Sequence, residues 1–487
     1  MIASAPVTSF IAGAWRPAAS RVVLREDPGN AAATAARWCP ASPADAARAM
    51  DAAADAAAAW SAVPLEARSA LLGQLLTAVE RRTEDFARVI TRENGKPRRE
   101  AVAEVAAGLR DARHALDEAQ RHGVAERASP GSAAVRSELL LEPAGVQLLI
   151  TPWNFPLATI LRKLVPALLY GNPAVVKPSE LTPGPAGLLF ALLAGLPFPP
   201  GAAALVLGYG AELGPVLTGH PALRGLSFTG STAAGQALAR QVAARDVRLQ
   251  LEMGGKNSLV VLADADLEAA VDAAVTGGFS CAGQWCTGTG RVIVEAPVHD
   301  EFVRRLAARA GRLRVGPGDG DPDVGPVVSA ERACFAATAT AAAVAAGARA
   351  HRGAPPPAGG HFVAPTVLDG VTAGMPAFTE ELFVPVLPVA AARDAEDAVR
   401  LANLGRYGLS ASVFSADTAR ATALARRIEA GIVHVNLHTS YREPALPVAG
   451  WRDSGHGLPE CGRFARDFFT RPRALYTAVR PPPSSRP

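Results

Sequence analysis

Short apolar segments alternate with helical stretches through the middle of this chain. The first series contains five such segments, at residues 146–150, 174–176, 203–207, 225–228 and 247–251. Strands that alternate with helices are joined by right-handed crossovers, which lay them side by side and parallel. This part of the chain is therefore predicted to form a doubly wound parallel sheet. A second series, from about 259 to 435, predicts a second domain of the same kind.

The length of the chain agrees with this division. A chain of 487 residues exceeds what one hydrophobic core usually supports, so two or more domains are expected. Ahead of the first series, residues 42–92 have a helical pattern that Ser42 can cap, and a second helix is predicted over 98–120. Residues 121–142 are predicted to form a projecting β-hairpin. The predicted fold class is α/β, with two doubly wound Rossmann-like domains and a β-arm.

Composition excludes several classes of function. The formal net charge is only +4 and no run of basic residues occurs, so nucleic acid is not an expected partner. The five cysteines lack metal-ligand spacing and no His-Glu-x-x-His pattern is present, so a reduced, cytoplasmic protein without a metal is expected. The N-terminus lacks the features of a signal peptide. Prolines break the most apolar segment, 186–207, so no membrane partner is expected.

One cysteine lies in a distinctive peptide. Cys286 follows a Gly-Gln turn and precedes Arg291, in the sequence Phe-Ser-Cys-Ala-Gly-Gln-Trp-Cys-Thr-Gly-Thr-Gly-Arg. Most free cysteines are small buried hydrophobic residues, and that interpretation stays open for a thiol considered alone. A thiol in this setting can also be a nucleophile.

Two upstream segments supply the groups that a nucleophilic thiol needs. Glu252, in Leu-Glu-Met-Gly-Gly-Lys-Asn, is a carboxylate beside a Gly pair that lets backbone segments approach closely. Asn154, in Thr-Pro-Trp-Asn-Phe-Pro-Leu, is a side-chain amide on a turn after an apolar run. Nucleophile, base and oxyanion donor are therefore all present. Glu252 alternatively forms no more than an ion pair with Lys163 or Lys177.

This trio, in this order, resembles the NAD(P)-dependent aldehyde dehydrogenase superfamily. Further matching segments are 10–15, 93–97, 171–180, 227–232, 380–385, 407–410 and 433–436. The resemblance implies that Cys286 attacks an aldehyde to give a thiohemiacetal and then a thioester, and that Glu252 activates the water that releases the acid. It also implies that Asn154 stabilises the oxyanion and that Lys163 is catalytic. Because relatives that make acyl-CoA lack a base at this position, hydrolysis is expected.

The resemblance places the cofactor on a separate set of residues: Trp153, Lys177, Glu180, Gly230, Ser231, Glu381 and Phe383. Gly230 and Ser231 lie where a strand leads into a helix, which admits a pyrophosphate to the amide end of that helix. A carboxylate at Glu180 would repel a 2′-phosphate, so NAD is favoured and NADP stays an alternative. Glu381 and Phe383 could instead be a solvated helix cap and a core aromatic.

Domain boundaries follow from these assignments. The cofactor-binding domain is predicted to comprise 1–127 and 143–252, and the catalytic domain 253–453. The oligomerisation arm is predicted to comprise 128–142 and 464–480, with a disordered tail at 481–487. In the family such an arm pairs with the C-terminal strand of another subunit, so a homodimer or homotetramer is expected.

The substrate is the most open question. Arg162 lies eight residues after Asn154, about two helical turns on and nearly on the same face, where relatives that act on succinic semialdehyde bind the far carboxylate. Arg442 could supply a second guanidinium, and Phe155 and Trp285 are further candidates for substrate contact. The segment 251–291 is also similar to enzymes acting on 2-oxoglutaric semialdehyde. An ω-carboxylated semialdehyde is therefore the predicted substrate.

Three alternatives to this substrate prediction stay open. Arg162 could simply pair with an acidic neighbour, which would favour an uncharged aliphatic or aromatic aldehyde. The same thiol could also serve an esterase or acyl transferase without redox chemistry. Departures from the family pattern add to the question, because Cys281 replaces the usual Asn, Val384 a Gly, and Val448 and Ala449 the usual Phe-Gly pair.

The positions of the lysines provide an independent check on the matching segments. Nearly all are arginine, and the four lysines, Lys96, Lys163, Lys177 and Lys256, all fall within or beside the matching segments. A lysine kept where arginine is the default suggests a site that needs a compact ammonium group.

Overall fold

The structure is a computed structural model that describes residues 5–18, 21–127 and 135–479. An eight-stranded sheet has the strand order β2-β1-β9-β8-β7-β10-β11-β21. The five central strands are parallel to one another, and β1 and β21 are antiparallel at the sides. The strands are β1 (Phe10–Ile11), β2 (Ala14–Trp15), β7 (Val146–Ile150), β8 (Ala174–Lys177), β9 (Ala203–Leu205), β10 (Leu223–Thr229), β11 (Arg248–Glu252) and β21 (Gly455–Gly457).

Helices cover both faces of this sheet. One face packs against α1 (Pro43–Ala62), α7 (Gly210–Gly219) and α8 (Thr232–Val242), through core residues such as Met50 and Leu213. The other face packs against α5 (Ala158–Leu169) and α6 (Pro183–Leu193), with α2 (Leu65–Arg81), α3 (Thr83–Asn94) and α4 (Arg98–His122) outside them. All five predicted strands of this series are present, so the predicted doubly wound sheet is confirmed.

The helical pattern over 42–92 corresponds to three helices rather than one. The helix α1 ends at Ala62, and Val63 is extended with φ −66° and ψ 129° because the next residue is Pro64. A second break lies at Arg82, between α2 and α3. Ser42 caps α1 as predicted, by accepting a hydrogen bond from the Asp45 backbone.

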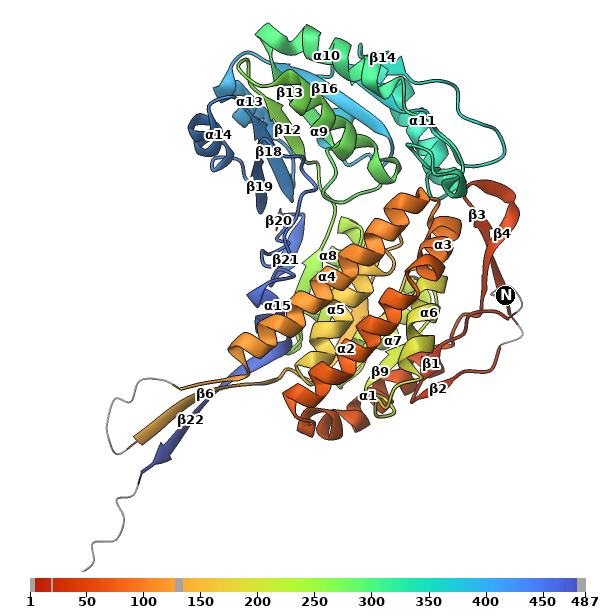
Figure 1. Cartoon of the computed structure of the whole chain (residues 1–487), viewed down its shortest axis with the longest axis vertical. Helices are drawn as coiled ribbons and strands as arrows, with labels where there is room; N and C mark the ends of the chain where they lie inside the picture. The colour runs from red at the N-terminus through yellow and green to blue at the C-terminus, as the bar shows by residue number, and fades with distance from the viewer. Residues whose placement is uncertain (1–4, 19–20, 128–134, 480–487) are drawn as a thin grey trace, which may run out of the picture.

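The second sheet has seven strands in the order β14-β15-β16-β13-β12-β18-β19. All except β14 are parallel. Its strands are β12 (Ser258–Val261), β13 (Arg291–Glu295), β14 (Arg349–Arg352), β15 (Thr366–Asp369), β16 (Val386–Ala392), β18 (Ser410–Phe414) and β19 (Ile432–Val435). Its helices are α9 (Leu267–Phe279), α10 (Ala296–Ala310), α11 (Ala330–Ala345), α12 (Pro376–Thr379), α13 (Ala395–Ala402) and α14 (Thr418–Ala425). These elements form the upper body in Figure 1 and share one core.

A ribbon of three strands projects from the lower body (Figure 1). It consists of β22 (Thr470–Ala478), β6 (Val135–Pro143) and β5 (Ala125–Arg127). The expectation that the arm pairs with the C-terminal strand of another subunit is wrong, because β22 pairs with β6 of the same chain along all nine residues. Residues 464–469 are not part of the ribbon, since they lie in α15 (Arg463–Phe469), where Phe468 is fully buried.

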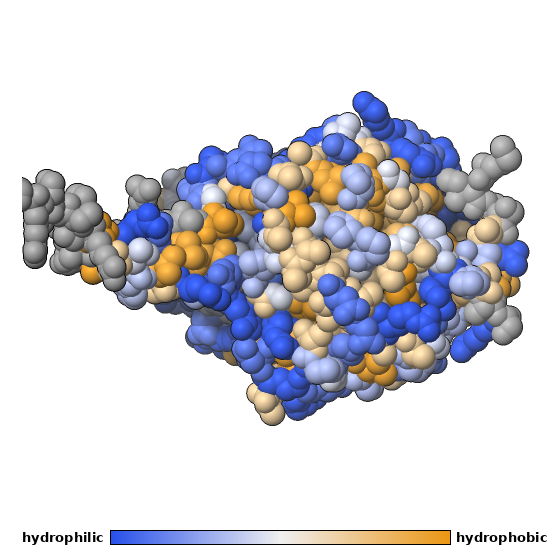
Figure 2. Space-filling view, turned by 90° about the horizontal axis from the view of Figure 1, so that it is seen from below, coloured by the Kyte–Doolittle hydropathy of each residue, from blue (hydrophilic) through white to orange (hydrophobic). Residues whose placement is uncertain are grey.

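The outer strand of the ribbon is largely exposed. In the described residues β22 has a neighbour on one side only, and Leu475, Tyr476 and Val479 are exposed. Figure 2 shows apolar side chains along this projection. The predicted segments 128–134 and 481–487 lie outside the described residues. Within the described ranges, no helix has the length and apolar character needed to cross a membrane.

Two small sheets complete the fold. The hairpin of β3 (Val23–Asp27) and β4 (Asn30–Trp38) lies beside α3. The strands β17 (Tyr407–Gly408) and β20 (Trp451–Arg452) pair between the two bodies (Figure 1). Because β20 follows the second sheet and β21 joins the first, the chain returns to the first body just after the predicted boundary at 453.

Candidate active site

The loop that carries Cys286 follows α9 and a short helical turn, η1 (Ser280–Gly283). Asn257 Nδ2 donates hydrogen bonds to the Cys286 carbonyl at 2.8 Å and the Gly288 carbonyl at 2.6 Å. Gly255 is needed for the close approach, because a Cβ there would lie 3.2 Å from the Cys286 carbonyl oxygen. The predicted Glu252 segment thus directly supports the loop of the predicted nucleophile.

Cys286 is partly exposed, and the protein atoms around its thiol raise its pKa. Burial raises the pKa of Cys286 to about 12, and the charge of Arg162 opposes this rise. Glu252 and Glu381 both act in the same direction as burial. The charges of Arg162, Glu252 and Glu381 therefore all act on the thiol of Cys286.

Asn154 contacts the backbone two residues before Cys286. Its Nδ2 donates to the Gln284 carbonyl at 3.0 Å, which leaves its second amide hydrogen available. Its backbone carbonyl accepts a hydrogen bond from Lys96 Nζ at 2.7 Å, and Lys96 pairs with Glu104 at 2.7 Å. The predicted oxyanion donor is therefore connected to the predicted nucleophile loop through Gln284.

Glu252 is buried at the end of β11. Burial raises its pKa well above the ordinary value, the carboxylate of Glu460 adds to the rise, and Lys163 opposes it. Lys163 itself donates to Ser227 Oγ at 2.7 Å and to Glu460, while Lys177 donates to the Pro178 carbonyl at 3.3 Å. The two lysines thus have other partners, and the enclosed Lys163 affects Glu252 through its charge.

Five of the predicted cofactor residues lie at or just after the ends of β7, β8 and β10. Ser231 caps α8 by accepting a hydrogen bond from Ala234 N, and Gly230 N donates to the Glu252 carbonyl at 3.1 Å. A Cβ on Gly235 would lie 2.5 Å from Met253 Sδ, so the first turn of α8 packs directly on the strand side. Glu180 is partly buried, and its charge raises the pKa of Lys177, although burial lowers it overall.

Glu381 and Phe383 complete this set. The Glu381 carboxylate accepts a hydrogen bond from Gly255 N at 3.0 Å, and burial raises its pKa. Phe383 has φ +56° and contacts the ring of Trp153 edge to face, with centroids 5.6 Å apart. Glu381 is therefore next to the Cys286 segment rather than a solvated helix cap.

The predicted substrate residues form an aromatic pair and a charged cluster. The rings of Phe155 and Trp285 lie 5.2 Å apart. Arg162 Nε donates to Asp111 at 2.9 Å, and Arg442 donates to both oxygens of the same carboxylate. The alternative that Arg162 pairs with an acidic neighbour is thus what its contacts show, and the neighbour is shared with Arg442.

Several residues of the site carried no sequence signal of their own. Asp111 joins the two arginines, and Glu460 lies within 3.5 Å of Arg162 and bonds to Lys163. Glu104 accepts from Leu157 N at 2.9 Å and pairs with Lys96. All three are carboxylates in helices or loops, where most carboxylates are solvated. Only their burial distinguishes them.

The lysine pattern, in contrast, did point to the site. All four lysines are buried, with exposed fractions of 2%, 1%, 4% and 4% for Lys96, Lys163, Lys177 and Lys256. Lysines are almost never buried without a specific partner or role. Among the residues that the structure describes, no group of three or more His, Cys, Asp or Glu residues is arranged to hold a metal ion.

Comparisons with known proteins agree with this geometry. The aldehyde dehydrogenase family model matches residues 15–475. The chain is 35% identical to the 2,5-dioxopentanoate dehydrogenase of Saccharolobus solfataricus, over 86% of this chain and 88% of that enzyme. It is 36% identical to retinaldehyde dehydrogenase 3 of Mus musculus, over 85% of this chain and 81% of that enzyme.

A solved structure matches nearly the whole molecule. The betaine aldehyde dehydrogenase of Staphylococcus aureus, crystallised with NAD+, superposes with a TM-score of 0.93 and 30% identity, and the match covers 98% of this chain and 96% of that chain. The fold, the order of the site residues and the sequence matches lead to one conclusion. The chain belongs to the aldehyde dehydrogenase family and is an oxidoreductase that acts on aldehydes.

Proposed function

We propose that this enzyme oxidises an aldehyde that carries a carboxylate at its far end. The observation that carries the proposal is the charge balance beside Cys286. Arg162, Lys163 and Arg442 are three cations, whereas Asp111 and Glu460 are the two carboxylates that pair with them. Burial keeps Glu252 protonated well above its ordinary range. While Glu252 is protonated, the cluster therefore has one cation in excess, which a substrate carboxylate would neutralise.

A carboxylate would have to take over contacts that already exist. The cavity beside Asp111, Arg162 and Cys461 has a volume of about 20 Å³, which is room for one water molecule. Guanidinium groups bind carboxylates in a bidentate manner, so either arginine can exchange part of its bond to Asp111 for the substrate. 2,5-Dioxopentanoate, the substrate in the name of one relative, is an aldehyde with a carboxylate of this kind.

The cofactor residues fit a nicotinamide dinucleotide, and the crystallised relative contains NAD+. Lys177 is 4% exposed but has only one long hydrogen bond in the described structure, although an ammonium has three donors. Such a buried donor fits ribose hydroxyls, with Glu180 beside it. Gly230 and Ser231 would receive the pyrophosphate, and Trp153, Glu381 and Phe383 the nicotinamide end. The cofactor supplies the acceptor for the hydride of the substrate carbon.

The protein residues then have the following roles. When Glu252 is deprotonated, its carboxylate accepts the proton of Cys286, and the sulfur forms a bond to the aldehyde carbon. Glu252 then releases this proton to solvent, so that it can act again as a base. The free amide hydrogen of Asn154 donates to the oxygen that gains the negative charge, an interaction typically worth about 3 kcal/mol. Loss of hydride from the same carbon leaves a thioester on Cys286. Glu252 takes a proton from water, which attacks the thioester and releases the acid and the thiol.

Lys163 and Glu460 would act on this cycle indirectly. Lys163 is enclosed and bonded to Glu460 and Ser227, so we assign it an effect through its charge. Its charge lowers the pKa of Glu252 while the Glu460 charge raises it. The pair thus adjusts how readily Glu252 gains and loses a proton.

We also propose a homodimer or homotetramer in a reducing compartment such as the cytoplasm. The exposed outer edge of β22 supports self-association, because an uncovered strand edge invites another chain. The five cysteines are free, as the thiol chemistry of Cys286 requires.

The test compares kcat/KM for an ω-carboxylated semialdehyde and an uncharged aldehyde of equal length. Arg162→Ala and Arg442→Ala should each lower the value for the charged substrate about 10- to 150-fold, the effect of losing a charged hydrogen bond worth ~1.5–3 kcal/mol. The uncharged substrate should change much less. Arg113→Ala is the control, because Arg113 lies on the same helix as Asp111 but pairs with Glu80 at the surface.

Two outcomes would contradict the proposal. Equal losses for both aldehydes would make the arginines structural, and the Phe155–Trp285 pair would then favour an uncharged substrate. Acid release without NADH absorbance would indicate an esterase or acyl transferase.

A further inference from the structure

The backbone just before the nucleophile turn has an unusual conformation. Cys281, Ala282 and Gly283 have φ values of +52°, +55° and +70°, so three successive residues lie in the left-handed region. Cys281 and Ala282 carry a Cβ, which makes this conformation unfavourable without support from the surroundings. Gln284 and Cys286 follow directly, so the direction of the thiol depends on how this stretch is held.

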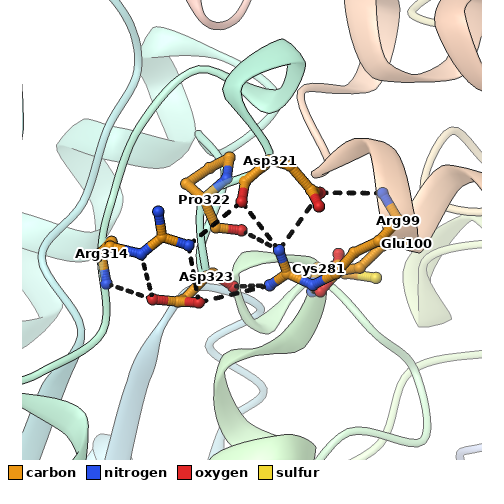
Figure 3. Close-up of polar contacts among 7 residues, drawn as sticks. All are labelled: Arg99, Glu100, Cys281, Arg314, Asp321, Pro322 and Asp323. Atoms are coloured by element: carbon orange, nitrogen blue, oxygen red, sulfur yellow. Dashed lines mark hydrogen bonds and ion pairs between the residues drawn. The ribbon is translucent and has the colours of Figure 1, made fainter.

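One carboxylate from the other body of the molecule supports this stretch. Cys281 N donates to both oxygens of Glu100, at 3.0 Å and 3.2 Å (Figure 3). Glu100 lies in the first turn of α4, which belongs to the cofactor side. On the opposite side, Gly283 packs so closely that a Cβ there would lie 2.3 Å from the Val384 carbonyl oxygen. The left-handed stretch is thus fixed between α4 and the segment beside Phe383.

The same end of α4 also supports the oxyanion side. Lys96 donates to the Asn154 carbonyl at 2.7 Å, and Glu104 accepts from Leu157 N at 2.9 Å. The two supported loops meet where Asn154 Nδ2 donates to the Gln284 carbonyl. We propose that Glu100 is a positioning residue, which aims Cys286 at the oxyanion donor by holding the Cys281 N–H.

The neighbouring residue has a separate task, which makes it a useful control. Arg99 donates to the carbonyls of Asp321, Pro322 and Asp323 (Figure 3). It connects α4 to the second body without a bond to the nucleophile loop. Substitution of Glu100 therefore tests the positioning of the thiol, and substitution of Arg99 tests the contact between the two bodies.

The inference rests on Cys286 being the nucleophile, and its test measures the thiol directly. In the full-length enzyme, Glu100→Met fills similar volume in a helix but accepts no hydrogen bond, whereas Glu100→Gln keeps an acceptor oxygen. Glu100→Met should slow both single-turnover NADH formation and alkylation of Cys286 by iodoacetamide by roughly 10- to 100-fold, the range expected for a misplaced reacting group. Glu100→Gln and Arg99→Ala should stay close to wild type, and NAD binding should be unchanged in all three.

A second substitution tests the physical cause. Asn adopts the left-handed conformation more readily than Cys, so Cys281→Asn should restore part of the rate lost in Glu100→Met. A merely structural role for Glu100 in α4 would not respond to a change at residue 281. If Glu100→Met folds poorly, a second comparison uses Glu100→Gln with and without Cys281→Asn. The single-turnover rate should fall less with rising temperature in the variant that carries Asn at position 281.

Wild-type single-turnover and alkylation rates in Glu100→Met would overturn the inference, as would an equal loss in Arg99→Ala. These outcomes differ from a failure of the proposed function. Dehydrogenase activity remaining in Cys286→Ala would contradict the assignment of Cys286 as the nucleophile. An inactive Cys286→Ala together with a normal Glu100→Met would contradict only the positioning role of Glu100.

Discussion

At the scale of single residues, the chemistry depends on the protonation of the Cys286 thiol and the Glu252 carboxyl group. Cys286 is protonated at neutral pH because burial raises its pKa to about 12. Cys286→Ala should abolish aldehyde oxidation, because the covalent intermediate cannot form, while NAD binding stays near normal. NADH absorbance and a cofactor titration measure the two properties.

Cys281 provides the control for this prediction. It lies five residues earlier and is buried, whereas Cys286 is partly exposed, and the neighbours of Cys281 are Glu100 and Lys96. Cys281→Ser should have a far milder effect than Cys286→Ala. An inactive Cys281→Ser together with an active Cys286→Ala would show that the wrong thiol was assigned.

Glu252 should control the second half of the reaction. Glu252→Gln cannot accept a proton from water, so release of the acid should slow by roughly a hundredfold or more, while hydride transfer is less affected. Rapid mixing should then show a burst of NADH followed by slow turnover. An unchanged steady-state rate without a burst would exclude Glu252 as the base.

The pH profile follows from the direction of the Glu252 pKa. Burial raises this pKa well above its usual value, and only the deprotonated form accepts a proton. The rate of acid release in the wild type should therefore rise with pH up to that raised pKa. The Glu252→Gln profile should lack this rise in the same range.

At the scale of elements, α3 and α6 are joined by a carboxyl group with a raised pKa. Glu93 accepts a hydrogen bond from Gly184 N at 2.9 Å, and burial raises its pKa from 4.5 to about 8. Between these two pH values the folded state binds more protons than the unfolded state, so the free energy of unfolding falls as pH rises. The total effect is at most about 5 kcal/mol.

Glu93→Gln should remove this dependence while keeping the acceptor oxygen. Tm measured between pH 5 and pH 9 should fall less steeply in the variant than in the wild type. The two curves should separate as pH rises toward 8 and run parallel only above it. Glu66→Gln is the control, because Glu66 is exposed on α2. Parallel curves for wild type and Glu93→Gln would contradict the assignment.

At the scale of the whole molecule, the projecting ribbon is the feature that a single chain leaves uncovered. Tyr476 is 71% exposed and Leu475 40% exposed on β22. Placing Asp at both positions should weaken self-association, because a charge would have to be buried at the contact. Sedimentation velocity should show a smaller species than for wild type. Val344→Asp, at an exposed position on α11, should leave the size unchanged, and an unaltered size in the ribbon variant would exclude this edge.

The sequence by itself determined the type of fold. Alternating apolar and helical segments predicted two doubly wound bodies, and the strands at 146–150 and 174–177 lie where the pattern indicated. Local patterns succeed here because each strand is buried on both faces and so is apolar along its length. The family was likewise evident from ordered motifs. The roles of Cys286, Glu252 and Asn154 stay predictions, although the structure brings them together.

Only the tertiary structure decided the partners of the charged groups and of the ribbon. Lys163 pairs with Glu460 across 297 positions, Arg442 with Asp111 across 331, and β6 with β22 of its own chain. A periodic pattern reports which face of an element is buried, but not which distant element covers it. Buried charges interact strongly only over a few ångströms, so their pairing and net balance depend on packing that no local segment contains.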